Sequence, residues 1–186
     1  MIKKFQKLKK LNLGCDYDYR KGWVNLDQYS GKADVVHDLN KYPWPFKENT
    51  FDYVYASHVL EHLDDVKRAL IEIWRISKNN AIVEIKVPYF NSYCAYGDVT
   101  HKHFFTFVSF DPFIRNPSPK NKVGYLPVLF ECKEKKLVWG ITNKLIFKPF
   151  CILMNWLVNL NPRFVEQRFP FLLPVEALHL KLIVKK

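Results

Sequence analysis

The sequence KLNLGCDYDYRKGWVNLD, at residues 10–27, decides the fold. Lys10–Gly14 is typical of a short apolar strand that ends at a glycine, and Trp23–Asp27 is typical of a second strand that ends at a carboxylate. Eight residues, 15–22, separate the two, which is too few for the full helix of a dinucleotide-binding unit. The G-x-G-x-x-G series and the P-loop pattern are both absent from the sequence. A bound pyrophosphate, and with it NAD, FAD or ATP, is therefore disfavoured.

Further strands and one clear helix follow this stretch. Ala33–His37 and Phe51–Ala56 have the same β-branched or aromatic character. Leu60–Ile76 places apolar residues at three- and four-residue spacing, which predicts an amphipathic helix with acidic residues near its start. Asn79 and Asn80 are expected to stop this helix before the next strand, Ala81–Val87.

The last third of the chain predicts a different arrangement. Leu126–Trp139 and Glu176–Val184 resemble two strands that can pair antiparallel at one edge, with a helical segment 143–160 between them. We therefore expect an α/β protein, with a Rossmann-like, mostly parallel sheet and an antiparallel edge strand in a three-layer sandwich. The sequence has no internal repeat and no low-complexity linker, so we expect residues 1–186 to form a single domain.

Two carboxylates end successive predicted strands. Asp27 closes the second strand, and Asp38 directly follows Ala33–His37. Ligands of open α/β sheets bind outside the carboxyl ends of the strands, where a carboxylate can accept hydrogen bonds from ribose hydroxyls. Either aspartate alone is about as readily explained as a turn cap. Together with the turn at Gly14 they indicate a nucleoside-shaped ligand without phosphates.

Four motifs stand in order along the first third of the chain: LNLGC at 11–15, GWVNLD at 22–27, DLNKYPWPF at 38–46 and FDYVYASHVLEHL at 51–63. These motifs resemble class I S-adenosyl-L-methionine-dependent methyltransferases, in particular a group of small methyltransferase-domain proteins. The later stretch GDVTHKHFFT at 97–106 also resembles a segment of that group. The resemblance covers about residues 10–115. It implies S-adenosylmethionine as cofactor and methyl transfer to an oxygen or nitrogen of a small-molecule or glycan-type acceptor.

The resemblance also implies which residues bind the cofactor. They lie at or just beyond the ends of the first four predicted strands: Gly14, Cys15, Asp16, Asp27, Asp38, Leu39, Ser57 and His58. The first three would face the methionine part, Asp27 the ribose hydroxyls, the pair at 38–39 the adenine, and the pair at 57–58 the methionine part again. The cofactor has a sulfonium and an ammonium but no phosphate, so it suits glycine and carboxylates better than an anion-binding helix N-terminus.

The irregular segment Tyr89–Phe113 is expected to form the acceptor side of the site, because it directly follows the fifth strand. It contains His101 and His103, which are the candidate catalytic bases by residue type. The alternative is a structural pair of histidines bonded to loop backbone. A base is needed only if the acceptor must lose a proton, since the sulfonium is already a reactive methyl donor.

One residue departs from the motif of the group. Asp16 stands where the pattern has glycine. Its side chain either crowds the cofactor or replaces the acidic residue usually found at the position of Asn12. Aspartate tolerates a left-handed backbone better than most residues, so the turn can survive. A non-catalytic, methyltransferase-like binding domain is therefore an alternative function.

A second alternative comes from His58-Val-Leu-Glu61-His62, which matches the H-x-x-E-H pattern of inverted zinc metallopeptidases. In a zinc-dependent hydrolase, His101 and His103 could complete the metal shell. The motif directly follows a strand, however, where the methyltransferase group also carries H-x-L-E-H. We therefore assign no metal ligand from the sequence.

Composition excludes several other classes. The chain has 29 basic and 18 acidic residues, a net charge of +11, and 48% hydrophobic residues, which are typical of a globular protein rather than a disordered one. Four scattered cysteines argue against a zinc ribbon or a disulfide framework and indicate a cytoplasmic location. No signal peptide or transmembrane segment is expected, because the most apolar run, Leu145–Leu160, is short and interrupted. The charge permits nucleic-acid binding, but no motif supports it, and the oligomeric state is left open.

Overall fold

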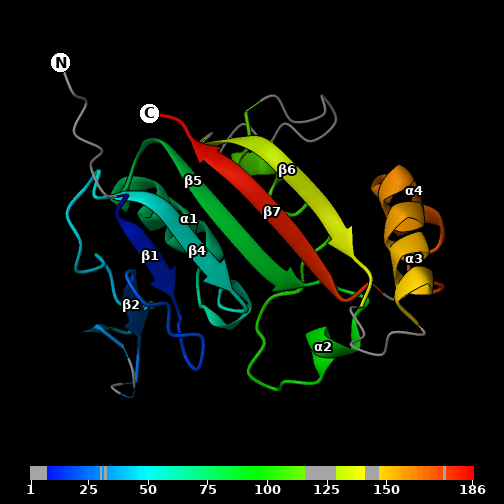
Figure 1. Ribbon diagram of the computed structural model, residues 1–186, viewed down its shortest axis with the longest axis horizontal. Helices are drawn as coiled ribbons and strands as arrows, with labels where there is room; N and C mark the ends of the chain where they lie inside the picture. Colours follow the sequence, from blue (N-terminus) through cyan, green and yellow to red (C-terminus); the bar gives the residue numbers. More distant parts are fainter. Residues whose placement is uncertain (1–7, 30, 32, 116–128, 141–146, 174) are drawn as a thin grey trace.

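The structure is a computed structural model that describes residues 8–29, 31, 33–115, 129–140, 147–173 and 175–186 (Figure 1). Its strands are β1 (Lys10–Leu13), β2 (Val24–Asp27), β3 (Val35–Val36), β4 (Phe51–Ser57), β5 (Ser77–Pro88), β6 (Phe130–Val138) and β7 (Ala177–Val184). Its helices are α1 (Val66–Ile76), α2 (Tyr93–Tyr96), α3 (Lys148–Leu160) and α4 (Pro162–Arg168), with short 3-10 turns η1 (Leu60–His62) and η2 (Asp111–Phe113).

The seven strands of the described residues join one sheet in the order β3-β2-β1-β4-β5-β7-β6. β1 to β5 run parallel to one another, and β7 runs antiparallel to both β5 and β6. The predicted α/β class, with a mostly parallel Rossmann-like sheet and an antiparallel element at one edge, is confirmed. The parallel order brings the carboxyl ends of β1, β2 and β4 to one end of the sheet.

The predicted helix Leu60–Ile76 is in fact two elements. η1 ends at His62, Leu63 is extended, and α1 begins only at Val66. The cause is Asp65, whose carboxylate accepts a hydrogen bond from the backbone N–H of Arg68 at 2.9 Å and so caps the new helix. The helix ends at Ile76 as predicted, but β5 begins directly after it at Ser77 rather than at Ala81.

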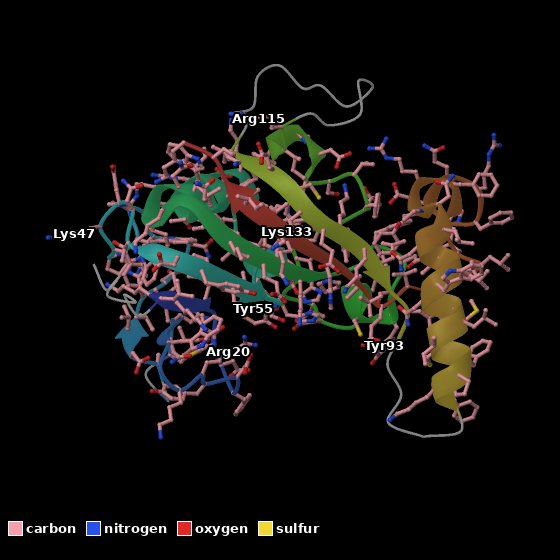
Figure 2. The ribbon with its side chains drawn as sticks, turned by 45° about the horizontal axis from the view of Figure 1, so that its top comes forward. Arg20, Lys47, Tyr55, Tyr93, Arg115 and Lys133 are labelled. Atoms are coloured by element: carbon pink, nitrogen blue, oxygen red, sulfur yellow. The ribbon has the colours of Figure 1, made fainter. Side chains whose placement is uncertain are left out.

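α1 packs on one face of the sheet (Figure 1), where its buried side chains join a single hydrophobic core that includes Ile73, Phe51 and Val83. On the opposite face, β5 and β7 carry half-buried polar side chains, among them Lys86 and Lys181. No helix joins β1 to β2 over this face. There the Arg20 guanidinium stacks on the ring of Tyr55, 3.7 Å from its centroid (Figure 2).

The predicted C-terminal elements are present. β6 and β7 form the expected antiparallel pair, and α3 lies within the predicted helical segment 143–160, of which 143–146 fall outside the described residues. Residues 126–128 of the predicted strand 126–139 also fall outside the described residues. The sequence reasoning did not predict α4. Among the described helices, none has the length and apolar character needed to cross a membrane.

Candidate functional site

A cavity of about 690 Å³ opens at the carboxyl ends of β1, β2 and β4. Its size is within the range of small-molecule and cofactor sites. It is lined by residues that follow these strands and by one later loop: Gly14, Asp16, Asp27, Gln28, Tyr29, His37, Asp38, Leu39, Asn40, His58, Val59, His62, Leu63, Val99, Thr100 and Lys102. Six of the eight residues predicted to bind the cofactor are in this lining.

Gly14 is required where β1 meets the cavity. Its φ is +58°, in the left-handed region that favours glycine. A Cβ atom at this position would lie 2.5 Å from the Val59 Cγ2 atom, which is closer than atoms can approach. Glycine at this position lets Val59 pack against the turn, and both residues line the cavity.

Asp27 is held firmly at the end of β2. Its Oδ2 accepts the backbone N–H of Asp16 at 2.9 Å, and its Oδ1 accepts the N–H of Tyr29 at 3.1 Å. Asp16 has a φ of +36°, so the turn keeps its left-handed backbone with aspartate in the glycine position. The carboxylate of Asp27 is thus fixed on the cavity wall, and its remaining lone pairs are available to hydroxyl donors.

The β3 side of the cavity is formed by Asp38, Leu39 and Asn40. The Asp38 carboxylate accepts the N–H of Asn40 at 3.0 Å, and the Asn40 side chain accepts the N–H of Asp64 at 2.8 Å. Leu39 is only 7% exposed, and its carbonyl accepts the indole N–H of Trp44. This wall therefore presents one carboxylate and one apolar side chain to a ligand.

Two predicted cofactor residues do not line the cavity. Cys15 is buried behind the β1 turn, where burial and the nearby Asp27 raise the pKa of its thiol. Ser57 is the last residue of β4 and pairs with Lys86 of β5. His58, the next residue, does line the cavity with a left-handed backbone, φ +55°, and its N–H donates to the Lys86 carbonyl.

The hydrolase geometry suggested by His58-x-x-Glu61-His62 does not form. That chemistry needs both histidines on one α-helix, one turn apart. Here His58 precedes the 3-10 turn η1 with a left-handed backbone, so it cannot present its ring beside that of His62 as a helix would. Instead His58 Nδ1 lies 3.2 Å from an oxygen of Glu61.

The loop after α2 reaches the cavity through Val99, Thr100 and Lys102 rather than through the predicted histidines. His101 Nδ1 donates to the Ala95 carbonyl at 3.0 Å, and His103 Nε2 donates to the Leu63 carbonyl at 2.8 Å. Neither ring lines the cavity. A base role for these two residues remains a prediction.

Sequence reasoning missed several lining residues, of which His62 and Thr100 are the most informative. His62 Nδ1 is 2.9 Å from the Thr100 hydroxyl, and the rings of His62 and His101 lie edge to face with centroids 4.7 Å apart. The sequence brings HVLEH and GDVTHKH together only in the zinc-hydrolase alternative, and it contains no signal for the contact between His62 and Thr100. Backbone hydrogen bonds hold the two segments side by side, because the N–H groups of residues 102 and 103 donate to the Glu61 carbonyl.

Comparison with known proteins places this site in a methyltransferase-type fold. Residues 11–85 match a family described as a methyltransferase domain. No curated protein matches the chain.

Solved structures with the same fold cover nearly all of the chain. A chain from the complex that contains the Haloferax volcanii Trm112 methyltransferase activator is 15% identical, with a TM-score of 0.59 over 96% of this chain and 83% of that one. An S-adenosylmethionine-dependent methyltransferase of Mesorhizobium loti is 12% identical, with a TM-score of 0.51 and coverages of 95% and 90%. The cyclase SpnF is also 12% identical, with a TM-score of 0.54 and coverages of 96% and 74%. Because a cyclase shares it, this fold does not by itself fix the reaction.

Proposed function

We propose that the protein binds S-adenosylmethionine in the cavity and transfers its methyl group to an oxygen or nitrogen of a small-molecule or glycan-type acceptor. The observation that carries the proposal is the Asp27 carboxylate. It is fixed by two backbone N–H groups on the cavity wall, one of them from Asp16 in the turn that follows Gly14, and Gly14 has no room for a Cβ atom. This is the arrangement that a ribose and a neighbouring amino-acid moiety require.

The charge of the lining supports the same ligand. Asp16, Asp27 and Asp38 all face the cavity. An ammonium and a sulfonium are stabilised by such carboxylates, whereas phosphate groups are repelled by them. Asp16 follows the Gly14 turn and lines the cavity, so in this proposal its carboxylate accepts hydrogen bonds from the ammonium of the methionine part. Methyl transfer then rests on alignment of the sulfonium methyl with the acceptor, since the donor is intrinsically reactive.

Calorimetric titration with S-adenosylhomocysteine, the demethylated product, tests the binding step without knowledge of the acceptor. We expect Asp27→Ala to weaken binding by about 2–3 kcal/mol, roughly 30- to 150-fold, because it removes hydrogen bonds to a charged acceptor. Asp18→Ala is the matched control. Asp18 lies in the same loop and pairs with Arg20, but it does not line the cavity. Equal affinity of the two variants would overturn the assignment of Asp27.

A binding domain without turnover is the second candidate. Two observations favour it. The Asp16 side chain occupies the cavity wall where the motif has glycine, and both predicted base histidines are bonded to backbone carbonyls. Transfer of a labelled methyl group to a panel of sugar and phenolic hydroxyls would decide between the two candidates. Tight S-adenosylhomocysteine binding with no transfer across the panel would favour the binding domain.

A further inference from the structure

Glu61 is a buried carboxylate without adequate compensation. Its side chain is fully buried, and neither carboxylate oxygen has a hydrogen-bond donor among the described residues. His58 Nδ1 lies 3.2 Å from Oε1, within ion-pair distance but outside hydrogen-bond geometry, and the same contact leaves Oε2 without a partner. A charge taken out of water costs several kcal/mol unless a cation or donors replace the water. These two oxygens are therefore available to a cation.

Two histidines converge on the same point. One ligand atom from each of Glu61, His62 and His101 lies within 4.8 Å of the other two. The loop that carries His101 is fastened to η1, because the N–H of Lys102 donates to the Glu61 carbonyl at 2.7 Å and its Nζ contacts Asp64 at 2.6 Å. The juxtaposition is thus built into the backbone of two segments far apart in the sequence.

Hydrogen bonds set the tautomer of both rings. Thr100 donates its only hydroxyl proton to the Asp98 carboxylate at 2.7 Å. In its contact with His62 Nδ1 the Thr100 hydroxyl oxygen must therefore be the acceptor of the hydrogen bond. His62 therefore carries its proton on Nδ1, and its Nε2 has a free lone pair. His101 Nδ1 donates to the Ala95 carbonyl, which can only accept, and this frees the Nε2 of His101 in the same way.

We propose that Glu61, His62 and His101 bind one divalent transition-metal ion. Two imidazoles and one carboxylate are a ligand set for zinc, iron, cobalt or manganese. Ligating histidines characteristically donate their other ring N–H to a carbonyl or to a further polar group, as both rings do here. Bonds of about 2.1 Å place ligands roughly 3–4 Å apart. Starting from separations of up to 4.8 Å, the cluster therefore needs to contract by about 1–2 Å.

The ion would border the cavity, because His62 and Thr100 both line it. On the proposed methyltransferase function, this position indicates a hydroxyl acceptor. The ion would lower the pKa of a bound alcohol, whose proton would pass to solvent. The alkoxide oxygen would then form the bond to the methyl carbon, while the carbon–sulfur bond breaks and leaves its electron pair on the neutral thioether.

The test is a titration of the chelator-stripped, full-length protein with Co²⁺, followed by its visible absorption, and with Zn²⁺ in competition. We expect one equivalent to bind. Glu61→Gln and His101→Ala should each weaken binding at least tenfold, since each removes one of three ligands. His37→Gln is the control, because His37 lines the same cavity but lies outside the cluster.

A stability measurement separates a metal site from a merely structural role of Glu61. At one fixed Zn²⁺ concentration, the melting temperature of the unmodified protein should rise by linkage, and that of Glu61→Gln should rise by less. The affinity of Glu61→Gln for S-adenosylhomocysteine tests the proposed cofactor binding independently of the metal site. If the folded protein takes up no Co²⁺, or if all three variants bind it equally, the metal site is wrong even where the cofactor binds.

Discussion

Two tryptophans, Trp44 and Trp156, mark two regions of the molecule that are fixed to the sheet by different means. Trp44 lies between β3 and β4 and is 2% exposed, whereas Trp156 lies on α3 and is 58% exposed. Around Trp44 the chain is held by burial. Around Trp156 it is held by polar contacts to the edge of the sheet. The cavity is built on the first kind of packing.

The Trp44 region combines apolar burial with a satisfied ion pair. The Trp44 ring is in the hydrophobic core, and its indole N–H donates to Leu39 on the cavity wall. Its backbone N–H donates to Glu72, which also pairs with Arg75 at 2.7 Å. Burial alone would raise the pKa of Glu72, but the hydrogen bonds from Arg75 and Trp44 outweigh it and hold the pKa below its usual value.

The α3 region closes the edge strand β6 with two asparagines one helical turn apart. Asn159 accepts the backbone N–H of Leu137 at 2.9 Å and donates to its carbonyl at 2.7 Å. Asn155 makes the same pair of contacts with Trp139, at 2.8 and 3.1 Å. These side chains supply hydrogen bonds that a further strand would make, so the C-terminal end of this edge is protected from pairing with another chain.

This use of asparagine leaves the apolar side chains of α3 facing outwards. Met154 and Val158 are buried, but the other apolar side chains of the helix are mostly exposed: Phe150, Ile152, Leu153, Trp156, Leu157 and Leu160. In Figure 2 many side chains of α3 and α4 extend away from the sheet. Burial therefore carries much of the stability in one region and little of it in the other.

The largest expected effect comes from Trp44→Ala. We expect a loss of about 3–5 kcal/mol in the free energy of unfolding, because a large buried ring leaves a cavity that its neighbours cannot fill. Urea unfolding followed by circular dichroism measures it. The variant should also weaken S-adenosylhomocysteine binding, since the ring supports Leu39. A loss below about 1 kcal/mol would contradict the distinction between the two regions.

The sequence predicts these two regions with unequal success, for a physical reason. The sequence predicts strands β1 and β2 and the residues Gly14 and Asp27, because a strand end, a required glycine and a carboxylate each leave a local signal. The start of α1 was missed because Asp65 caps the helix inside an apparently continuous apolar pattern. The directions of His101 and His103 could not be predicted, since they depend on backbone bonds to Glu61 that join distant segments.

For α3, the spacing of residues predicts the helix but not which face it presents. In most helices the apolar stripe faces the core and asparagines face water. Here the backbone N–H and C=O groups at the end of the sheet edge need hydrogen-bond partners, which Asn155 and Asn159 supply and apolar side chains cannot. The direction in which the asparagines of α3 face can be predicted only if β6 is known to be an edge strand.

An intermediate effect is expected from the double variant Asn155→Ala, Asn159→Ala. Four hydrogen bonds to β6 are lost, but water can replace some of them at this partly exposed edge. We therefore expect a loss of about 2 kcal/mol rather than the larger cost of fully buried groups. Hydrogen exchange of the Leu137 and Trp139 amides should accelerate at least tenfold, with the Leu13 amide unchanged as the internal control. Equal protection of Leu137 and Trp139 in both proteins would show that α3 does not cover the edge in solution.

The smallest effect is expected from Trp156→Ala, which is the same chemical change as Trp44→Ala at the other region. The ring is more than half exposed and alanine is the better helix former, so the lost contact area is partly offset. We expect the free energy of unfolding to fall by about 1 kcal/mol or less, measured by urea unfolding under the conditions used for Trp44→Ala. A loss approaching that of Trp44→Ala would mean that the exposed side of α3 is covered in solution. Sedimentation of the unmodified protein at two concentrations would then show whether a second copy of the chain covers it. If the loss is small and the protein sediments as a monomer, α3 is attached through its asparagines, and its apolar side contributes little to folding.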